Sequence, residues 1–472
     1  MIRSSATFSP VALRALLPEA QFLRCDDVTV RSVSVDERAC CEGDLYVCLE
    51  SHQTEQRSAL LTARSRGAVA ALTDGPIDGV DMPMCVVADV ARAYAVLCQH
   101  LMGDPSSRLK LIGVAGSLGK TNTAMLITAA LDAHGCNTAV ASSLGVYDGA
   151  ARRDVDVRML GPSGLARWLA ESEAVGCSHA VLEIPADPRW CDRLAGVHFD
   201  AVCLTNMIDD ERCEPWSDQH VAEWLPQLVE SLAPEAALVV NADDERLWRM
   251  ADESGRPALA VGSDEDVQLA GTVLETHVGE QTLLLSAGNT SMPLRTSLAG
   301  RFQLLNQLLA AGTALLAGGD LTTAVRGLET VRIVPGRLEP ISCGQAFALF
   351  VDTAPAPVAL RYALESIRPT GGRLICGLAP RSGASASPSQ ENRRMRQFLA
   401  TAEAESDVVV AGEFASVIAQ TLSLAEPGDS VLLSRCGRAD LTSRVGIGDD
   451  SGQVREYLYT HVSRDEPAAT WT

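Results

Sequence analysis

An apolar segment that runs into a glycine-rich turn and then into a helix constrains the fold of this chain most. Residues 109–115, LKLIGVA, have the composition of a buried strand, and the turn at residues 116–121, GSLGKT, leads directly into an apolar helical segment. The glycines let backbone N–H groups curl around an anion, and a helix N-terminus adds partial positive charge. Lys120 can reach the β- and γ-phosphates of a nucleotide, and the Thr121 hydroxyl can bind Mg²⁺. Because Val114 stands where the common pattern has a glycine, this is a shorter G-x-x-G-K-T variant, and it predicts nucleotide binding.

Lysine is almost absent from the rest of the chain. It occurs only at Lys110 and Lys120, and every other basic residue among the 39 lysines and arginines is an arginine. Chemistry that requires a lysine must therefore use one of these two side chains.

Length and composition exclude several classes of protein. A chain of 472 residues is expected to form two to four domains, and 47% hydrophobic residues are enough to build their cores. The net charge of −21 argues against a general nucleic-acid binder, which would need a basic face. No apolar run approaches the roughly 18 residues that a membrane span requires. The 14 cysteines include no C-x-x-C pair, which favours reduced thiols and a cytoplasmic location.

The pattern of apolar segments divides the chain into three α/β stretches, with predicted boundaries at residues 1–106, 107–335 and 336–472. In the first, we expect a helix with Leu13, Leu16 and Leu17 on one face, although its Arg/Ser-rich start is also compatible with a transit peptide. A half-buried strand is expected over residues 28–36.

The second and third stretches alternate strands with helices, which is typical of mostly parallel sheets covered on both faces. In the second stretch, apolar runs such as residues 139–146, 179–184 and 200–206 end in polar residues, and open α/β sheets bind ligands at these strand ends. A long helix is expected over residues 301–319. The third stretch repeats the pattern on a smaller scale.

Several motifs occur in a fixed order along the chain. Besides the GSLGKT turn, they are DERACCEGDLY at 36–46, EIPAD at 183–187, TNM at 205–207, NADD at 241–244, GRFQLLN at 300–306, PGRLE at 335–339, DTAPAP at 352–357, CGRA at 436–439 and DDSGQV at 449–454. Their order and spacing resemble the Mur ligase family over nearly the whole chain. The most similar branch is UDP-N-acetylmuramoyl-tripeptide synthetase.

The resemblance implies a three-domain protein with a UDP-sugar-binding-like first domain, a central ATP-binding domain and an amino-acid-binding-like third domain. It implies an ATP-dependent acid–amino acid ligase of peptidoglycan precursor synthesis, with ATP and Mg²⁺ as cofactors. Expected partners are a UDP-MurNAc-peptide, an amino acid and other Mur ligases. The implied catalytic residues are Lys120, Glu183 and Arg193, and the implied metal ligands are Thr121, Glu183 and Glu211. The implied nucleotide-binding residues are Gly116, Ser117, Leu118, Gly119, Lys120, Thr121, Asn122, Asn306, which would face the adenine, Arg337, and Asp352, which would contact the ribose.

The chain also departs from the family pattern. The family's carbamylated lysine is expected shortly after Asp210, where residues 213–232 contain no lysine. Two family histidines are replaced by Asp187 and Glu211, and Glu37 stands at a serine of the family's uridine pocket. The family's diaminopimelate signature, D-N-P-R, has no counterpart after residue 412.

Two interpretations follow from these residues. The retained nucleotide residues favour a divergent ligase that acts through an acyl phosphate. The missing lysine and histidines favour a catalytically impaired relative that binds nucleotide or precursor and regulates or scaffolds an active ligase.

Overall fold

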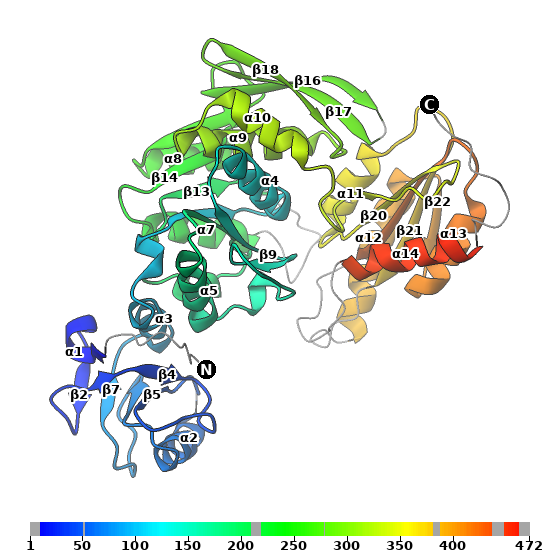
Figure 1. Cartoon of the computed structure of the whole chain (residues 1–472). Helices are drawn as coiled ribbons and strands as arrows, with labels where there is room; N and C mark the ends of the chain where they lie inside the picture. Colours follow the sequence, from blue (N-terminus) through cyan, green and yellow to red (C-terminus); the bar gives the residue numbers. More distant parts are fainter. Residues whose placement is uncertain are drawn as a thin grey trace.

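A computed structural model describes residues 10–50, 52–208, 219–277, 279–380, 388–436 and 448–461. Three main sheets follow one another along the chain, one in each of the three predicted stretches (Figure 1). The predicted α/β class is therefore confirmed. The domain boundaries at 106/107 and 335/336 stay predictions.

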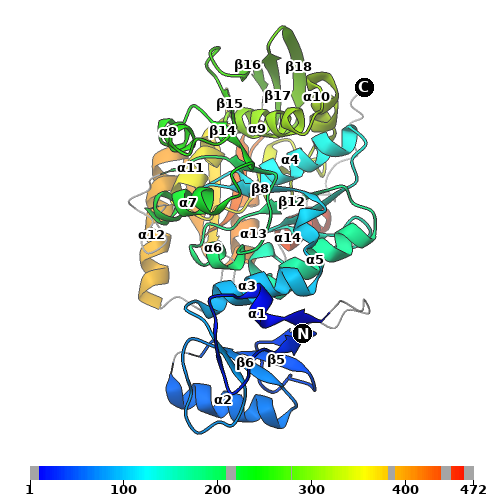
Figure 2. The ribbon, with the colours of Figure 1, turned by 90° about the vertical axis from the view of Figure 1, so that its left-hand side faces the viewer.

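The first sheet has the strand order β2-β7-β6-β5-β4. Its strands are β2 (Gln21–Leu23), β4 (Ser32–Ser34), β5 (Asp44–Val47), β6 (Ala70–Thr73) and β7 (Met84–Val86), with helices α2 (Gln53–Ser65) and α3 (Val90–Leu101). Figure 2 shows α3 between this sheet and the central body. Apolar residues of α3 share a core cluster with Ala166 of the central body, so the two parts are packed together.

One local prediction for the first stretch was wrong in detail. Residues 28–36 form two short strands in different sheets, because β3 (Thr29–Val30) pairs with β1 (Val11–Ala12) whereas β4 pairs with β5. The first helix, α1 (Leu13–Leu16), has only four residues, but its predicted apolar face is confirmed. Leu13 is fully buried, and Leu16 and Leu17 are partly buried against the same core cluster. Alternation alone could not show that the chain changes partner strand after Val30.

The central sheet has the strand order β11-β10-β9-β12-β8-β13-β14-β15-β16-β17-β18. The central strands, β9-β12-β8-β13-β14-β15-β16, run parallel to one another. The strands at the two edges, β10 and β11 on one side and β17 and β18 on the other, pair antiparallel. The bounds are β8 (Lys110–Ala115), β9 (Thr138–Ser142), β10 (Gly145–Tyr147), β11 (Arg152–Arg153), β12 (His179–Glu183), β13 (Ala201–Leu204), β14 (Ala237–Asn241), β15 (Ala258–Gly262), β16 (Leu269–His277), β17 (Glu280–Ala287) and β18 (Thr290–Thr296). The predicted run at 139–146 is thus two strands, since β9 and β10 form a hairpin.

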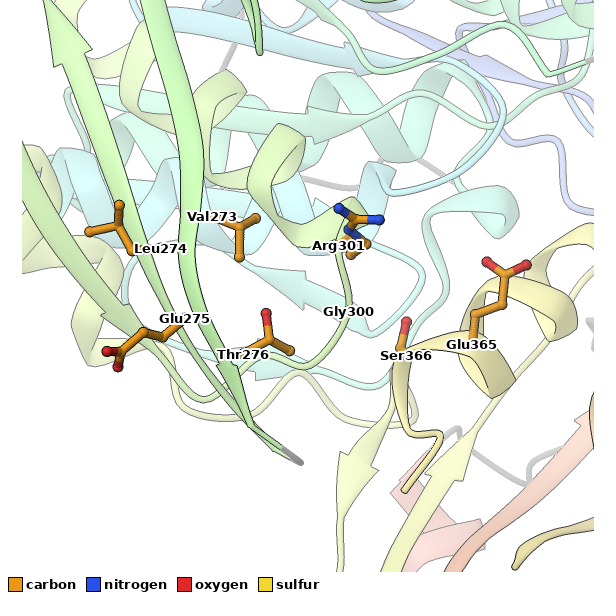
Figure 3. Close-up of a pocket in the computed structure, with 8 residues that line it drawn as sticks. All are labelled: Val273, Leu274, Glu275, Thr276, Gly300, Arg301, Glu365 and Ser366. Atoms are coloured by element: carbon orange, nitrogen blue, oxygen red, sulfur yellow. The ribbon is translucent and has the colours of Figure 1, made fainter. Parts of the chain in front are cut away.

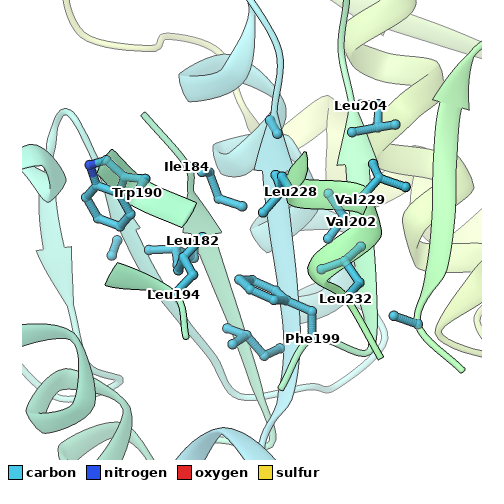
Figure 4. Packing of buried hydrophobic residues seen from close by; sticks show 14 of the residues in the cluster. Leu182, Ile184, Trp190, Leu194, Phe199, Val202, Leu204, Leu228, Val229 and Leu232 are labelled. Carbon is cyan, nitrogen blue, oxygen red and sulfur yellow. The ribbon is translucent and has the colours of Figure 1, made fainter. Parts of the chain in front are cut away.

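Successive side chains of a strand point to opposite faces of the sheet, and here both sets are apolar. Helices therefore cover both faces of the parallel strands. One face carries Leu182, Val202 and Leu204, which pack with Trp190 and Leu228 in the cluster of Figure 4. The opposite face carries residues such as Ile112 and packs against α4, α9 and α10. The helices of this body are α4 (Lys120–Ala133), α5 (Pro162–Ala174), α6 (Arg189–Arg193), α7 (Gln219–Ser231), α8 (Glu245–Glu253), α9 (Phe302–Leu316) and α10 (Leu321–Thr330).

The third sheet has the strand order β19-β20-β23-β21-β22. Its strands are β19 (Glu339–Pro340), β20 (Ala348–Asp352), β21 (Leu374–Pro380), β22 (Val408–Ala411) and β23 (Ser430–Cys436), and its helices are α11 (Pro357–Ser366), α12 (Pro388–Glu405), α13 (Phe414–Leu424) and α14 (Gly448–His461). Within the described part of the chain, no helix is both long and apolar enough to cross a lipid bilayer.

Candidate nucleotide site

The glycine-rich turn lies where strand β8 ends and helix α4 begins. Gly116 has a φ of +130° and Gly119 a φ of +84°, and a Cβ on Gly116 would lie 2.3 Å from Oγ1 of Thr205. Only glycine tolerates both the backbone conformation and this close approach. Asn206 holds the turn from outside, since its side chain accepts from the Leu118 amide at 2.9 Å and donates to the Leu118 carbonyl at 3.0 Å. The conformation of the turn is therefore fixed by hydrogen bonds to Asn206, which follows the neighbouring strand β13.

The ammonium group of Lys120 lies over this loop. Its Nζ donates to the carbonyl oxygens of Gly116 at 2.8 Å and Ser117 at 2.9 Å. The other lysine of the chain, Lys110, forms an ion pair with Asp200 at 2.6 Å at the opposite end of β8. Lys120 is thus the lysine at the loop, where the sequence predicted it.

Three oxygen-bearing side chains meet beside the loop. The hydroxyls of Thr121 and Ser143 are 3.0 Å apart, and the Ser143 amide donates to Oε2 of Glu183 at 2.9 Å. Glu183 is buried, at 6% exposed. These residues come from α4 and from the ends of β9 and β12, because the carboxyl ends of parallel strands share one edge of a sheet. Sequence reasoning missed Ser143, which lay inside the predicted run at 139–146, because the run was not divided at its two adjacent serines.

Asn306 of α9 packs against the other side of the loop. Its Oδ1 accepts from the Thr123 hydroxyl at 3.2 Å, and a Cβ on Gly119 would lie 2.5 Å from the same oxygen. Its Nδ2 donates to Gln303 at 2.9 Å. The structure thus brings Asn306 to the loop as predicted, while its contact with adenine stays a prediction.

Arg337 reaches the loop from the third body. Its Nη2 donates to the hydroxyls of Ser143 at 3.3 Å and Thr121 at 3.4 Å, and its Nη1 donates to the Thr353 carbonyl at 3.4 Å. Residues 116–121, 143, 183, 306 and 337 are therefore gathered at one place from five distant parts of the sequence. A guanidinium here adds a second fixed positive charge beside Lys120.

Asp352 supports the turn that carries Arg337. Its Oδ1 accepts from the Leu338 amide at 2.9 Å, and Thr353 donates from its amide to the Gly336 carbonyl at 3.0 Å. Burial raises the pKa of the Asp352 carboxyl, although Arg337 and the backbone amides act in the opposite direction. The predicted ribose contact of Asp352 stays a prediction.

Arg193 of α6 contacts backbone carbonyls and an aromatic ring, and its predicted catalytic role stays a prediction. Its Nη1 donates to the carbonyl oxygens of Arg158 at 3.3 Å and Leu160 at 3.5 Å, and its guanidinium lies 5.5 Å from the centre of a Trp190 ring. These contacts hold the chain at residues 158–160. Arg158 itself pairs with Asp156 and interacts electrostatically with Glu183, which sequence reasoning did not anticipate.

Three further residues singled out by the sequence are Glu211, Asp187 and Ser117. Glu211, the third predicted metal ligand, lies outside the described residues, as does most of the CGRA motif. Asp187, which stands at a family histidine, forms an ion pair with Arg189 at 2.7 Å. Ser117 accepts from the Ile208 amide through its hydroxyl at 3.1 Å.

The residues at the loop fit a nucleotide phosphate and Mg²⁺. Asn122 Oδ1 and Thr205 Oγ1 are buried beside the loop and have no hydrogen-bond partner within the described part of the chain. Buried polar atoms are normally paired, so unpaired ones at a glycine-rich loop favour a bound group. The hydroxyl of Thr121 and the carboxylate of Glu183 are the hard oxygen ligands that Mg²⁺ prefers.

A hollow lies between the central and third bodies, away from the glycine-rich loop. It has a volume of about 390 Å³ and is lined by Thr276 of β16, Gly300 and Arg301 before α9, and Glu365 and Ser366 of α11, among others (Figure 3). No predicted nucleotide residue lines it, so this hollow is distinct from the candidate site at the loop.

Known proteins resemble the chain at three levels. A model of the Mur ligase middle domain matches residues 114–314. The UDP-N-acetylmuramoyl-L-alanyl-D-glutamate--2,6-diaminopimelate ligase of Geobacillus thermodenitrificans is 26% identical over 473 residues, covering 93% of this chain and 95% of that protein. A solved structure of a ligase with the same name aligns with a TM-score of 0.69 at 19% identity, over 96% of this chain and 100% of the other. The MurF ligase of Thermotoga maritima, solved in complex with ADP, aligns with a TM-score of 0.62 at 16% identity, over 91% and 98%.

Proposed function

The protein belongs to the Mur ligase family, and we propose that it is an ATP-dependent ligase that adds an amino acid to a UDP-N-acetylmuramoyl-peptide in peptidoglycan precursor synthesis. The observation that carries this proposal is the meeting of Lys120, Thr121 and Arg337 at one glycine-rich loop. The diaminopimelate ligases among its relatives supply the substrate class. The reaction consumes ATP and a UDP-linked precursor, so we expect the protein in the cytoplasm. All cysteines that the structure describes are free thiols, which is compatible with that reducing compartment.

The chemistry has two steps. A carboxylate of the precursor attacks the γ-phosphate of ATP and releases ADP, which leaves an acyl phosphate. The amine of the incoming amino acid then displaces phosphate and leaves an amide. Catalysis of this kind depends on positioning and on neutralising phosphate charge.

The residues at the loop suit the first step. Lys120 would bind the phosphates together with loop amides other than those of Ser117 and Leu118, which donate to Asn206. Arg337 would oppose negative charge on the transferred group. Thr121 and Glu183 would hold Mg²⁺, which supplies further charge neutralisation when it is bound. Asn306 and Asp352 would orient the nucleoside, as the family resemblance implies.

Titration calorimetry of the purified chain tests this proposal directly. We expect Mg-ATP to bind, and phosphate to be released when a UDP-MurNAc-dipeptide and a suitable amino acid are added. Lys120→Ala should remove both. Absence of phosphate release with every amino acid of a panel would contradict turnover, and an unchanged affinity in Lys120→Ala would contradict the loop assignment.

A second candidate function has its own support in the sequence. Helix α7 and the segment before it contain no lysine that could be carbamylated, and Lys110 is already paired with Asp200. On this alternative, the protein binds nucleotide or precursor and regulates or scaffolds an active ligase. Mg-ATP binding without phosphate release would favour it.

A gain-of-function variant separates the two candidates further. A lysine introduced in α7 together with Glu211→His would restore groups that the family resemblance calls for. Recovered turnover means that the rest of the ligase site is intact, whereas an inert but folded variant that still binds Mg-ATP favours the regulatory role. A variant with Glu211→His alone is the control.

A further inference from the structure

The buried carboxylate of Glu339 bonds to two separate parts of the third body. It lies two residues after Arg337 and is 5% exposed. Its Oε2 accepts from the Gly336 amide at 3.0 Å and from the Ser451 hydroxyl at 2.6 Å, and its Oε1 accepts from Nη2 of Arg455 at 2.9 Å. One side chain therefore connects the turn that carries Arg337 with helix α14.

The turn around Arg337 needs such support. Gly336 has a φ of +63°, and Leu338 has a φ of +45°, which is unfavourable for a residue with a side chain. The amides on either side of Arg337 are both held by carboxylates, Gly336 by Glu339 and Leu338 by Asp352. A strained conformation persists only where its surroundings fix it, so these two carboxylates determine where the guanidinium lies.

Helix α14 is itself firmly attached to its sheet. Val454 and Leu458 are buried in a core cluster with Val351 and Leu433. The buried Asp450 forms an ion pair with Arg435 at 2.8 Å. A displacement of the turn would therefore have to break the bonds of Glu339 to a well-packed helix.

We propose that Glu339 is a positioning residue that couples helix α14 to the nucleotide loop by holding Arg337 against Thr121 and Ser143. Glu339 contacts neither the loop nor any group that would react, so its effect passes through Arg337. The predicted effect of Glu339 on nucleotide binding rests on the proposed function. The hydrogen-bonded link from Glu339 to the turn and to α14 is independent of that function.

A double-mutant cycle on Mg-ATP affinity tests the coupling. Glu339→Gln keeps the shape of the side chain but removes the charge that faces Arg455, and we expect it to weaken binding about tenfold. In an Arg337→Met background, the same change should have almost no further effect. Arg455→Met should behave as Glu339→Gln does, and it acts from the more exposed side of the pair should Glu339→Gln fail to fold. Glu426→Gln removes a charge that pairs with Arg373 at 3.5 Å elsewhere in the same body, and it should leave affinity unchanged.

The possible outcomes distinguish this proposal from the function itself. Equal losses in both backgrounds, or no loss at all, would overturn the positioning role. If the unmodified chain does not bind Mg-ATP, the proposed function fails, and hydrogen exchange on the full chain decides the remaining question. Glu339→Gln should then speed exchange of the Gly336 amide and of residues 451–458 of α14, and unchanged exchange would overturn the link.

Discussion

Arg337 donates a hydrogen bond to the hydroxyl of Thr121 across 216 positions of sequence. Thr121 lies in the first turn of α4, directly after the glycine-rich loop, whereas Arg337 lies in the PGRLE turn at the start of the third body. The contact brings two fixed positive charges, Lys120 and Arg337, to one loop in a chain whose net charge is −21. A local basic site in an acidic protein is what selective binding of a polyphosphate requires.

Replacing Arg337 should weaken nucleotide binding without unfolding the protein. Arg337→Met retains much of the apolar length of the side chain but removes the charge and both hydroxyl contacts, so we expect Mg-ATP affinity to fall about ten- to a hundredfold. Titration calorimetry measures the change. Arg332→Met, at an exposed arginine nearby, is the matched control and should bind as the unmodified chain does. Equal affinities for both variants would remove Arg337 from the site.

Gly119 and Gly135 have nearly the same backbone conformation, so their alanine variants distinguish the effect of backbone strain from the effect of a steric clash at the loop. Gly119 has a φ of +84° and Gly135 a φ of +80°, but only at Gly119 would a Cβ meet a neighbour, the Asn306 amide oxygen at 2.5 Å. Both alanine variants should lose about 1–2 kcal/mol of unfolding free energy, because a left-handed backbone is unfavourable for alanine. Only Gly119→Ala should also lose the rise in melting temperature that Mg-ATP produces. If Gly135→Ala loses it as well, the loop is not the cause.

The sequence predicted the loop and its supporting residues because these signals are local or ordered along the chain. A strand, two glycines, Lys120 and Thr121 in succession require no knowledge of distant contacts. Asn306 and Arg337 were found through motifs in a family order, and the structure brings both to the loop. The α/β class followed from alternating apolar segments, and the parallel centre of the large sheet bears it out.

The features that the sequence did not predict depend on contacts between distant residues. Ser143 gains its place only because β9 and β12 end side by side, which puts its amide on Glu183. The bonds of Arg193 to the backbone carbonyls of residues 158 and 160 also join segments that no local pattern connects. The antiparallel β16–β18 extension and the division of residues 28–36 between two sheets likewise depend on strand partners, which periodicity does not specify.

The third body should lose stability in acid through Asp429. Hydrogen bonds from Arg373 lower the pKa of this carboxyl from 3.8 to about 2. Because the folded pKa lies below the unfolded one, the stabilisation is fully present above pH 3.8 and is lost as pH falls through about 2. Asp429→Asn should therefore cost about 1–3 kcal/mol at neutral pH, and the difference from the unmodified chain should shrink in acid. Chemical unfolding followed across this pH range measures it, and a difference that does not vary with pH would contradict the charge argument.

Asp352 should show the opposite dependence, because burial raises the pKa of its carboxyl above 3.8. The folded state then binds the proton more tightly than the unfolded chain, so stability falls as pH rises from 3.8 through the raised pKa, and the cost persists above it. Asp352→Asn removes this cost and keeps an oxygen that can accept from the Leu338 amide. We expect the variant to melt at the same or a higher temperature at neutral pH, with the advantage fading towards acid, while its stabilisation by Mg-ATP decreases. Thermal unfolding with and without Mg-ATP measures both effects. A variant that is less stable at neutral pH would mean that attraction between Asp352 and Arg337 outweighs the cost of burying the charge.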